Sequence, residues 1–282
     1  MSARPQDVWA TLSQEQRDAS YNNNLAVKNS AELIERRNAA SEKYRAAHAK
    51  ALDIPYGDKP RMAFDLYPAE NAGPTLIFIH GGYWQRNSRE VFATYAEGLN
   101  KVGWSVAMPS YSLAPQTTLT EIVNELRQSL DWLAANGAKY DVAGPYVLSG
   151  WSAGGHLTAM LLDHSAVVAG LAISGVYELG TIRETYLNDL LKLTEAEVTA
   201  LSPLRLPVIN KPMTIAYGDN ELPALVSDSR KLHAMRTAAG AVGPLIPIAG
   251  EDHFSILDQF HSGGALLKAA QDILALSQRS AA

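Results

Sequence analysis

Short apolar runs alternate with helical patterns along the chain from about residue 60. Between two such runs, residues 117–137 carry apolar side chains at helical spacing, with Thr118 and Glu121 as a capping box and Gly137 as the C-cap. Strands alternating with helices predict an α/β fold, in which a mostly parallel central sheet is covered by helices on both faces. The runs that predict strands are Leu76–Ile79, Ser105–Met108, Tyr146–Leu148, Val168–Ile173, Met213–Tyr217 and Leu245–Ile248.

The first 55 residues differ in composition: they are polar and rich in alanine. Residues 29–50 are the best helix candidate there, with Ser30 as the cap and a weak apolar stripe of Ile34, Tyr44 and Ala47. We therefore predict an N-terminal helical extension over residues 1–55 and one catalytic α/β domain over residues 56–282. The extension could serve as a lid or cap, as a contact in a homodimer, or as both.

Composition narrows the classes of function. The 282 residues are 47% hydrophobic and 19% charged, which is ordinary for a globular protein. A net charge of −5 provides no basic field for nucleic acid or an anionic membrane, so the expected partner is a small molecule. The absence of cysteine excludes disulfides, thiolate catalysis and cysteine-ligated zinc. The first twenty residues lack the apolar core of a secretory signal, which predicts a cytoplasmic protein. The longest apolar region, Leu157–Leu179, is broken by Asp163, His164 and several glycines and does not predict a membrane span.

The strongest chemical motif is the stretch from Gly150 to Gly154, which reads GWSAG. It follows a predicted strand and opens a helical pattern, and this is the context of a nucleophile elbow, the sharp turn that exposes a catalytic serine. The flanking glycines are needed because side chains at those positions would collide with the neighbouring elements. The pattern identifies Ser152 as a candidate nucleophile; the alternative is a simple glycine-rich turn.

A second motif, HGGYWQ at residues 80–85, follows the strand Leu76–Ile79. When a serine attacks a carbonyl, fixed N–H donors must already point at the developing oxyanion. Glycines let backbone amides turn inward, so we expect the N–H groups of Gly82 and Tyr83 to act with that of Ala153, which follows the nucleophile. His80 is interpreted as an orienting loop residue rather than a base.

A serine nucleophile needs a histidine base and a carboxylate that orients it. In the chain order of α/β-hydrolases the histidine comes last, which selects His253 in the loop after Leu245–Ile248. The acid should follow the strand Met213–Tyr217, where Asp219 and Glu221 are both candidates. Spacing alone leaves these two open, because Asp219 could equally be a turn residue and Glu221 a solvent-facing carboxylate.

Large aromatic residues lie beside both motifs. Tyr83, Trp84 and Trp151, and less strongly Tyr177, could form a wall around the acyl or aryl part of a substrate. The alternative is that some of them belong to the core, as large aromatics usually do.

Together these motifs resemble kynurenine formamidase (arylformamidase), an α/β-hydrolase related to the hormone-sensitive-lipase-like esterases. The resemblance covers most of residues 60–260 and rests on HGGYWQ (80–85), YSLAPQTTLTEIV (111–123), GWSAGGHL (150–157), SGVYEL (174–179) and DHFSI (252–256). It implies a serine hydrolase without metal or cofactor. By its position between a glycine and a proline, it also implies that the acid is Glu221, where the family has aspartate; the family usually has histidine at position 151.

The resemblance implies cleavage of an aryl formamide, similar to N-formylkynurenine, through an acyl-enzyme intermediate. A carboxylesterase acting on short-chain or aryl esters is the alternative within enzymes. An alternative of another class is a catalytically silent α/β-hydrolase-fold protein that binds a ligand. Intact candidates for nucleophile, base, acid and oxyanion loop favour an enzyme.

Overall fold

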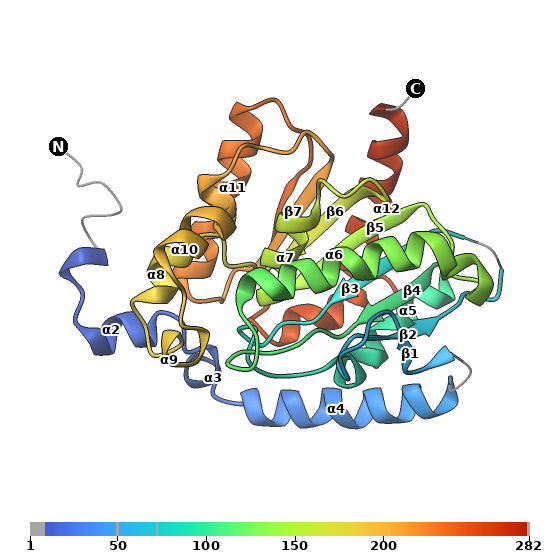
Figure 1. Ribbon diagram of the computed structural model, residues 1–282, viewed down its shortest axis with the longest axis horizontal. Helices are drawn as coiled ribbons and strands as arrows, with labels where there is room; N and C mark the ends of the chain where they lie inside the picture. The colour runs from blue at the N-terminus through green and yellow to red at the C-terminus, as the bar shows by residue number, and fades with distance from the viewer. Residues whose placement is uncertain (1–8, 49–50, 72, 281–282) are drawn as a thin grey trace.

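A computed structural model describes residues 9–48, 51–71 and 73–280. Its strands form one eight-stranded sheet in the order β1-β2-β4-β3-β5-β6-β7-β8 (Figure 1). The first three strands in this order pair antiparallel, and all later pairs are parallel. The strands are β1 (Ile54–Pro55), β2 (Ala63–Tyr67), β3 (Thr75–Ile79), β4 (Ser105–Pro109), β5 (Tyr146–Trp151), β6 (Val167–Ile173), β7 (Met213–Gly218) and β8 (Leu245–Ile248).

Every predicted run forms a strand, from β3 to β8, which confirms the mostly parallel α/β sheet. The sequence patterns missed β1 and β2. Strand β2 reads AFDLY and is buried throughout, but Asp65 interrupts its apolar run. That carboxylate accepts hydrogen bonds from Arg45 Nε at 2.7 Å and Arg89 Nε at 2.9 Å. Burial alone would raise the pKa of Asp65, and the two guanidinium groups hold it below its usual range.

Helices cover both faces of the sheet, and each face has its own hydrophobic core. Helices α6, α7 and α11 pack on one face; α5, α12 and the 3₁₀ helices η2 and η5 pack on the other (Figure 1). The helices from α5 onward are α5 (Ala96–Lys101), α6 (Leu119–Asn136), α7 (Ala153–Leu161), α8 (Leu179–Arg183), α9 (Asn188–Leu191), α10 (Glu195–Leu201), α11 (Pro223–Ala238) and α12 (Ala265–Ser280), with η2 (Arg89–Tyr95), η3 (Gly137–Tyr140), η4 (Pro203–Arg205) and η5 (Ser255–Phe260).

Helix α6 begins as the sequence predicts. Thr118 accepts a hydrogen bond from the Glu121 N–H, and the Glu121 side chain reaches back to the Thr118 N–H, so the capping box is confirmed. Gly137 follows the last helical residue but stays right-handed, and the chain continues into η3. The left-handed residue that ends this segment is Asp141.

The N-terminal segment comprises α2 (Gln14–Ala19), α3 (Asn23–Ala26) and α4 (Ser30–Ala47). Figure 1 shows α4 as a long helix along the lower edge of the molecule, with α2 and α3 beside α8 and α9. Ser30 is not the cap: Asn29 is the N-cap residue, and the Ser30 hydroxyl donates to the Asn24 carbonyl. Helix α4 packs on η2, where Ser41 Oγ accepts a hydrogen bond from the Thr94 N–H. The contact face of α4 is largely polar, which explains its weak apolar stripe.

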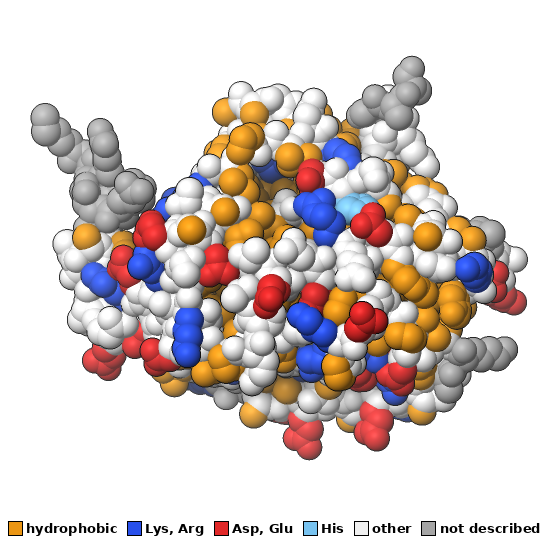
Figure 2. Space-filling model, in the orientation of Figure 1, with side chains coloured by type: hydrophobic (Ala, Val, Ile, Leu, Met, Phe, Trp, Pro, Cys, Tyr) orange, Lys and Arg blue, Asp and Glu red, His pale blue; other side chains and the backbone are white. Residues whose placement is uncertain are grey.

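The surface of the described residues is mixed in charge. On the face shown in Figure 2, acidic and basic side chains are interspersed with apolar ones rather than grouped by sign. Among the described helices, none has the length and apolar character that would let it cross a membrane.

Candidate active site

The elbow motif forms the turn between β5 and α7. Ser152 adopts φ 59° and ψ −118°, a left-handed backbone conformation that non-glycine residues rarely adopt. A Cβ at Gly150 would lie 2.3 Å from the Gly154 carbonyl oxygen, and one at Gly154 would lie 2.0 Å from the Ile79 carbonyl oxygen. Neither contact is sterically allowed, so both positions require glycine. The strained turn places the serine between the end of the strand and the first turn of the helix.

The structure brings three of the predicted site residues into one hydrogen-bonded chain. His253 Nε2 lies 3.1 Å from Ser152 Oγ, and His253 Nδ1 lies 2.8 Å from Glu221 Oε2. Each residue follows a different parallel strand: Ser152 follows β5, Glu221 follows β7 and His253 follows β8. The carboxyl ends of parallel strands lie at the same edge of the sheet, which is why residues about 100 positions apart meet there.

Glu221 is the carboxylate that faces the histidine. Its side chain is fully buried, and its second oxygen accepts hydrogen bonds from the Ser174 hydroxyl and from the Gly218 N–H. These donors stabilise the ionised form and fix the carboxylate opposite His253 Nδ1. Asp219 lies elsewhere: it is exposed, and its carboxylate accepts a hydrogen bond from the Gly250 N–H in a neighbouring turn.

The loop after β3 presents backbone donors beside the serine. Gly82, Tyr83 and Trp84 have positive φ angles of 120°, 50° and 58°. The Gly82 carbonyl accepts hydrogen bonds from the N–H groups of Gln85 and Arg86, three and four residues later, so the loop makes one tight turn. In the described part of the chain, no protein acceptor is bonded to the N–H of Gly82, Tyr83 or Ala153. These N–H groups are therefore available to a ligand.

Two carbonyl groups of the same loop already accept hydrogen bonds from side chains. The Tyr111 hydroxyl donates to the His80 carbonyl at 2.8 Å, and the Asn87 amide donates to the Gly81 carbonyl at 3.2 Å. His80 itself is buried, stacks on Tyr111 at 4.4 Å between ring centroids, and has Nδ1 2.9 Å from the Gly81 oxygen. Burial lowers the pKa of His80 to about 3, which keeps its imidazole neutral. These contacts fix the position of His80 within the loop after β3.

A cavity of about 90 Å³ lies over the serine and the histidine. Its walls come from the loop after β3, from the residues around His253 and, unexpectedly, from the N-terminal segment. Tyr83 ties that segment down: its hydroxyl donates to the Tyr21 carbonyl at 2.7 Å and accepts from the Asn23 amide at 2.9 Å. The lining residues are Tyr21, Asn22, Asn23, Asn24, Ile34, Arg37, Gly82, Tyr83, Arg86, Asn87, Trp151, Ser152, Tyr186, His253 and Phe254.

The aromatic residues expected at the substrate divide between cavity and core. Tyr83 and Trp151 line the cavity. Trp84 does not; it is wholly buried in the core, edge-to-face with His156 at 5.0 Å, because the left-handed turn directs its side chain inward. Tyr177 is also wholly buried in the core. The expectation of a substrate contact therefore fails for Trp84, and core packing holds instead.

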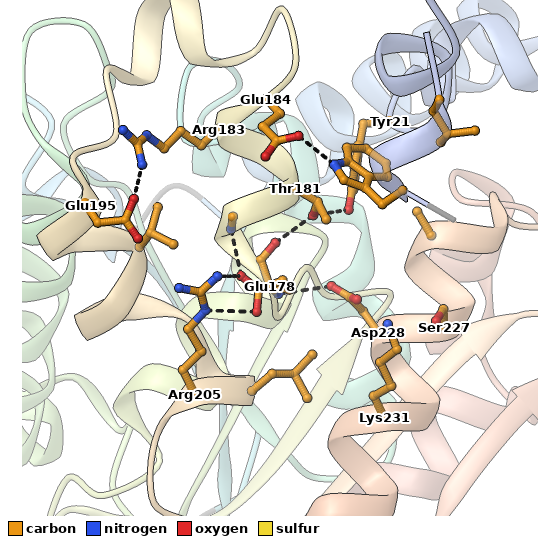
Figure 3. Close-up of a pocket in the computed structure, with 16 residues that line it drawn as sticks. Tyr21, Glu178, Thr181, Arg183, Glu184, Glu195, Arg205, Ser227, Asp228 and Lys231 are labelled. Carbon is orange, nitrogen blue, oxygen red and sulfur yellow. Dashed lines mark hydrogen bonds and ion pairs between the residues drawn. The ribbon is translucent and has the colours of Figure 1, made fainter. Parts of the chain in front are cut away.

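A second, larger cavity of about 1020 Å³ lies between the N-terminal segment and helices α8, α10 and α11. Figure 3 shows its polar walls, where Arg205 pairs with Glu178 and Arg183 pairs with Glu195. Tyr21 lines this cavity as well as the one over the serine, and its hydroxyl lies 2.6 Å from the Thr181 hydroxyl. The N-terminal segment thus borders both spaces.

Sequence reasoning missed three residues of this site. Ser174, which bonds to Glu221, has φ 51° at the end of β6, and its position after a buried strand was the available signal. Tyr21 and Arg37 come from the N-terminal segment, which no motif connected to the serine. For Arg37 the available signal was weak: a basic residue among small polar ones on the buried face of α4.

Residues 64–167 match the BD-FAE family model. The chain is 28% identical to the kynurenine formamidase of Danio rerio, over 92% of this chain and 95% of that protein. It is 29% identical to the kynurenine formamidase of Salmo salar, over 79% and 81% respectively. The similarity that the motifs predicted is thus confirmed over most of the chain.

A solved structure gives the same picture of the fold. The putative thioesterase from Silicibacter sp. TM1040 superposes with a TM-score of 0.80 and 27% identity, over 90% of this chain and 98% of that one. The fold is therefore that of an α/β-hydrolase, as predicted. Together with the similarity to kynurenine formamidases, this identifies the chain as a hydrolase.

Proposed function

We propose that this hydrolase cleaves a small aryl formamide through a covalent intermediate on Ser152. The observation that carries the proposal is the chain of contacts from Glu221 through His253 to Ser152, at 2.8 and 3.1 Å, beside unbonded backbone N–H groups. The similarity to kynurenine formamidases supports an aryl formamide resembling N-formylkynurenine as the substrate class.

In the first half of the reaction, Ser152 Oγ attacks the formyl carbon while His253 Nε2 takes the hydroxyl proton. The negative charge that develops on the formyl oxygen is stabilised by the N–H groups of Gly82, Tyr83 and Ala153. The carbon–nitrogen bond then breaks, and His253 returns the proton to the leaving amine. Glu221 holds the imidazole in the productive tautomer throughout.

In the second half, water attacks the formyl ester on Ser152 while His253 takes one of its protons. The ester bond breaks, the proton returns to Ser152 Oγ, and formic acid leaves and ionises to formate in water. No metal or cofactor takes part in the proposed steps.

The size of the cavity favours a small acyl group. An engineered cavity of about 150 Å³ is large enough to bind benzene, whereas the space over Ser152 is about 90 Å³. A formyl group fits such a space, and an aryl ring would extend beyond it, toward Tyr21, which also borders the larger cavity.

The second candidate is a carboxylesterase, since the same groups cleave esters and a structural neighbour is described as a putative thioesterase. Comparing kcat/KM for an aryl formamide and the matched aryl formate or acetate ester separates the two. Turnover of the formamide within about a hundredfold of the ester supports a formamidase, because amides are the harder substrates. Ester turnover with an untouched formamide would assign the esterase.

A cytoplasmic location and a homodimer stay predictions. Cell fractionation and light scattering, respectively, would test them.

A further inference from the structure

Arg37 is a buried cation in the wall of the cavity over Ser152. It belongs to α4, faces the same way as Ile34 one turn earlier, and is only 8% exposed. Its guanidinium carbon lies 4.3 Å from the centre of the Phe92 ring. Phe92 in turn packs against Trp151, the residue before the serine, at 5.8 Å between ring centroids. The charge therefore lies close to the proposed nucleophile.

No carboxylate pairs with this guanidinium among the residues that the structure describes. The guanidinium donates instead to the amide oxygen of the neighbouring Asn38, at 3.2 Å from Nε and 2.9 Å from Nη2. Other arginines nearby do have acids: Arg36 pairs with Asp258, and Arg45 pairs with Asp65. Burying a charge without an opposite charge is costly, and burial accordingly lowers the pKa of Arg37. The burial of Arg37 without an acidic partner therefore suggests that a ligand supplies the opposite charge.

The other residues that line the cavity add positive charge and no negative charge. The exposed Arg86 also lines it, without an ion pair to any described acid. No aspartate or glutamate is among the lining residues, and the three asparagines 22–24 are neutral. In a chain of net charge −5, this cavity is a local site of positive charge.

We infer that Arg37, supported by Arg86, binds a carboxylate of the substrate in the cavity over Ser152. A guanidinium presents a planar fork of donors that matches a carboxylate, and two of its nitrogens bind only a neutral amide here. The inference rests on the proposed function, because it names a feature of the substrate of the same site. It adds which residues of this chain would hold an acidic group of that substrate, namely Arg37 and Arg86.

The test uses a matched pair of substrates, an aryl formamide whose side chain ends in a carboxylate and the same compound with a carboxamide in its place. If the formamide is not cleaved, an aryl ester pair of the same design is used. Ratios of kcat/KM for the anionic and neutral members are measured for the unaltered chain, for Arg37→Met and for Arg36→Met. Arg36 is the matched control: it is the adjacent residue of the same helix, carries the same charge and pairs with Asp258 instead.

The unaltered chain should prefer the anionic substrate. Arg37→Met should lower the anionic-to-neutral ratio by about 10- to 100-fold, the effect of one charged hydrogen-bonded contact, and Arg37→Lys should restore part of it. Arg36→Met should leave the ratio unchanged.

Equal losses on both substrates in Arg37→Met, together with a lower Tm, would assign Arg37 a purely structural role and overturn the inference. An unaltered ratio would overturn it as well. Failure of the proposed function is distinguishable, because it would appear as no turnover of either substrate in the unaltered chain.

Discussion

The indole N–H of Trp151 donates a hydrogen bond of 2.8 Å to the backbone carbonyl of His253. The two rings lie 4.8 Å apart. Trp151, the residue before Ser152, thus anchors the loop that carries His253. Trp151 therefore both lines the cavity over Ser152 and contacts the loop around His253.

Replacing Trp151 by phenylalanine keeps a ring and removes this hydrogen bond. We expect Trp151→Phe to lower the free energy of unfolding by about 1 kcal/mol and kcat by several-fold, because the loop around His253 loses one anchor. Urea unfolding and steady-state kinetics measure the two effects. Unchanged kcat with unchanged stability would show that the bond has no positioning role.

The two candidate acids make opposite predictions. Glu221→Gln should lower kcat by about 10³- to 10⁴-fold, since an amide cannot hold the imidazole in the required tautomer and stabilise its protonated form. Asp219→Asn should stay within about threefold of the unaltered chain, because its carboxylate only accepts a bond from Gly250 in an exposed turn. Steady-state kinetics on both variants decides between them, and the reverse order would move the acid to Asp219.

Tyr83 links the oxyanion loop to the N-terminal segment through its hydroxyl. Tyr83→Phe removes the bonds to Tyr21 and Asn23 but leaves the backbone N–H in place. We expect roughly tenfold faster hydrogen exchange in residues 21–26, because the segment loses two buried hydrogen bonds that hold it against the loop after β3. Mass-detected exchange measures this, with α6 as the internal reference. Equal exchange in both proteins would show that the Tyr83 hydroxyl does not hold the N-terminal segment in place.

Much of the site could be predicted because its chemistry depends on local pattern. The elbow glycines, the capping box of α6 and the loop after β8 each follow from a short stretch of sequence. Other features depend on distant partners: β2 holds Asp65 only because Arg45 and Arg89 reach it from other elements. Helix α4 buries Arg37 rather than a leucine, so its inner face could not be recognised from hydrophobic spacing.

Trp84 is a second residue whose environment could not be predicted from the sequence. Its position beside the oxyanion loop suggested a substrate contact. Whether a residue in a turn points outward or inward is set by backbone dihedral angles that the sequence does not display, and the left-handed turn here buries it.

Asp228 in the larger cavity should make stability depend on pH. Burial raises its pKa to about 6, although the N–H groups of Tyr177 and Glu178 donate to it. In the folded state it therefore holds a proton that the unfolded chain releases near pH 4. Its contribution to stability is present at pH 4 and falls as the pH rises to about 6, since ionisation in a buried site is costly.

Asp228→Asn removes this titration and keeps an oxygen for both N–H donors. The gain in free energy of unfolding over the unaltered chain should be small near pH 4 and reach about 2–3 kcal/mol above pH 7. Urea unfolding of both proteins across this range measures the difference. A difference that does not vary with pH would contradict the raised pKa.

The central claim is that Ser152 is a nucleophile activated by His253. Its most direct measurement is the rate and position of labelling by an aryl organophosphonate, read by intact mass and peptide mapping in the unaltered chain, Ser152→Ala and His253→Ala. We predict one adduct on Ser152, none in Ser152→Ala, and labelling at least a hundredfold slower in His253→Ala. An unlabelled Ser152 in the unaltered chain, or labelling at equal rates with and without His253, would contradict the account.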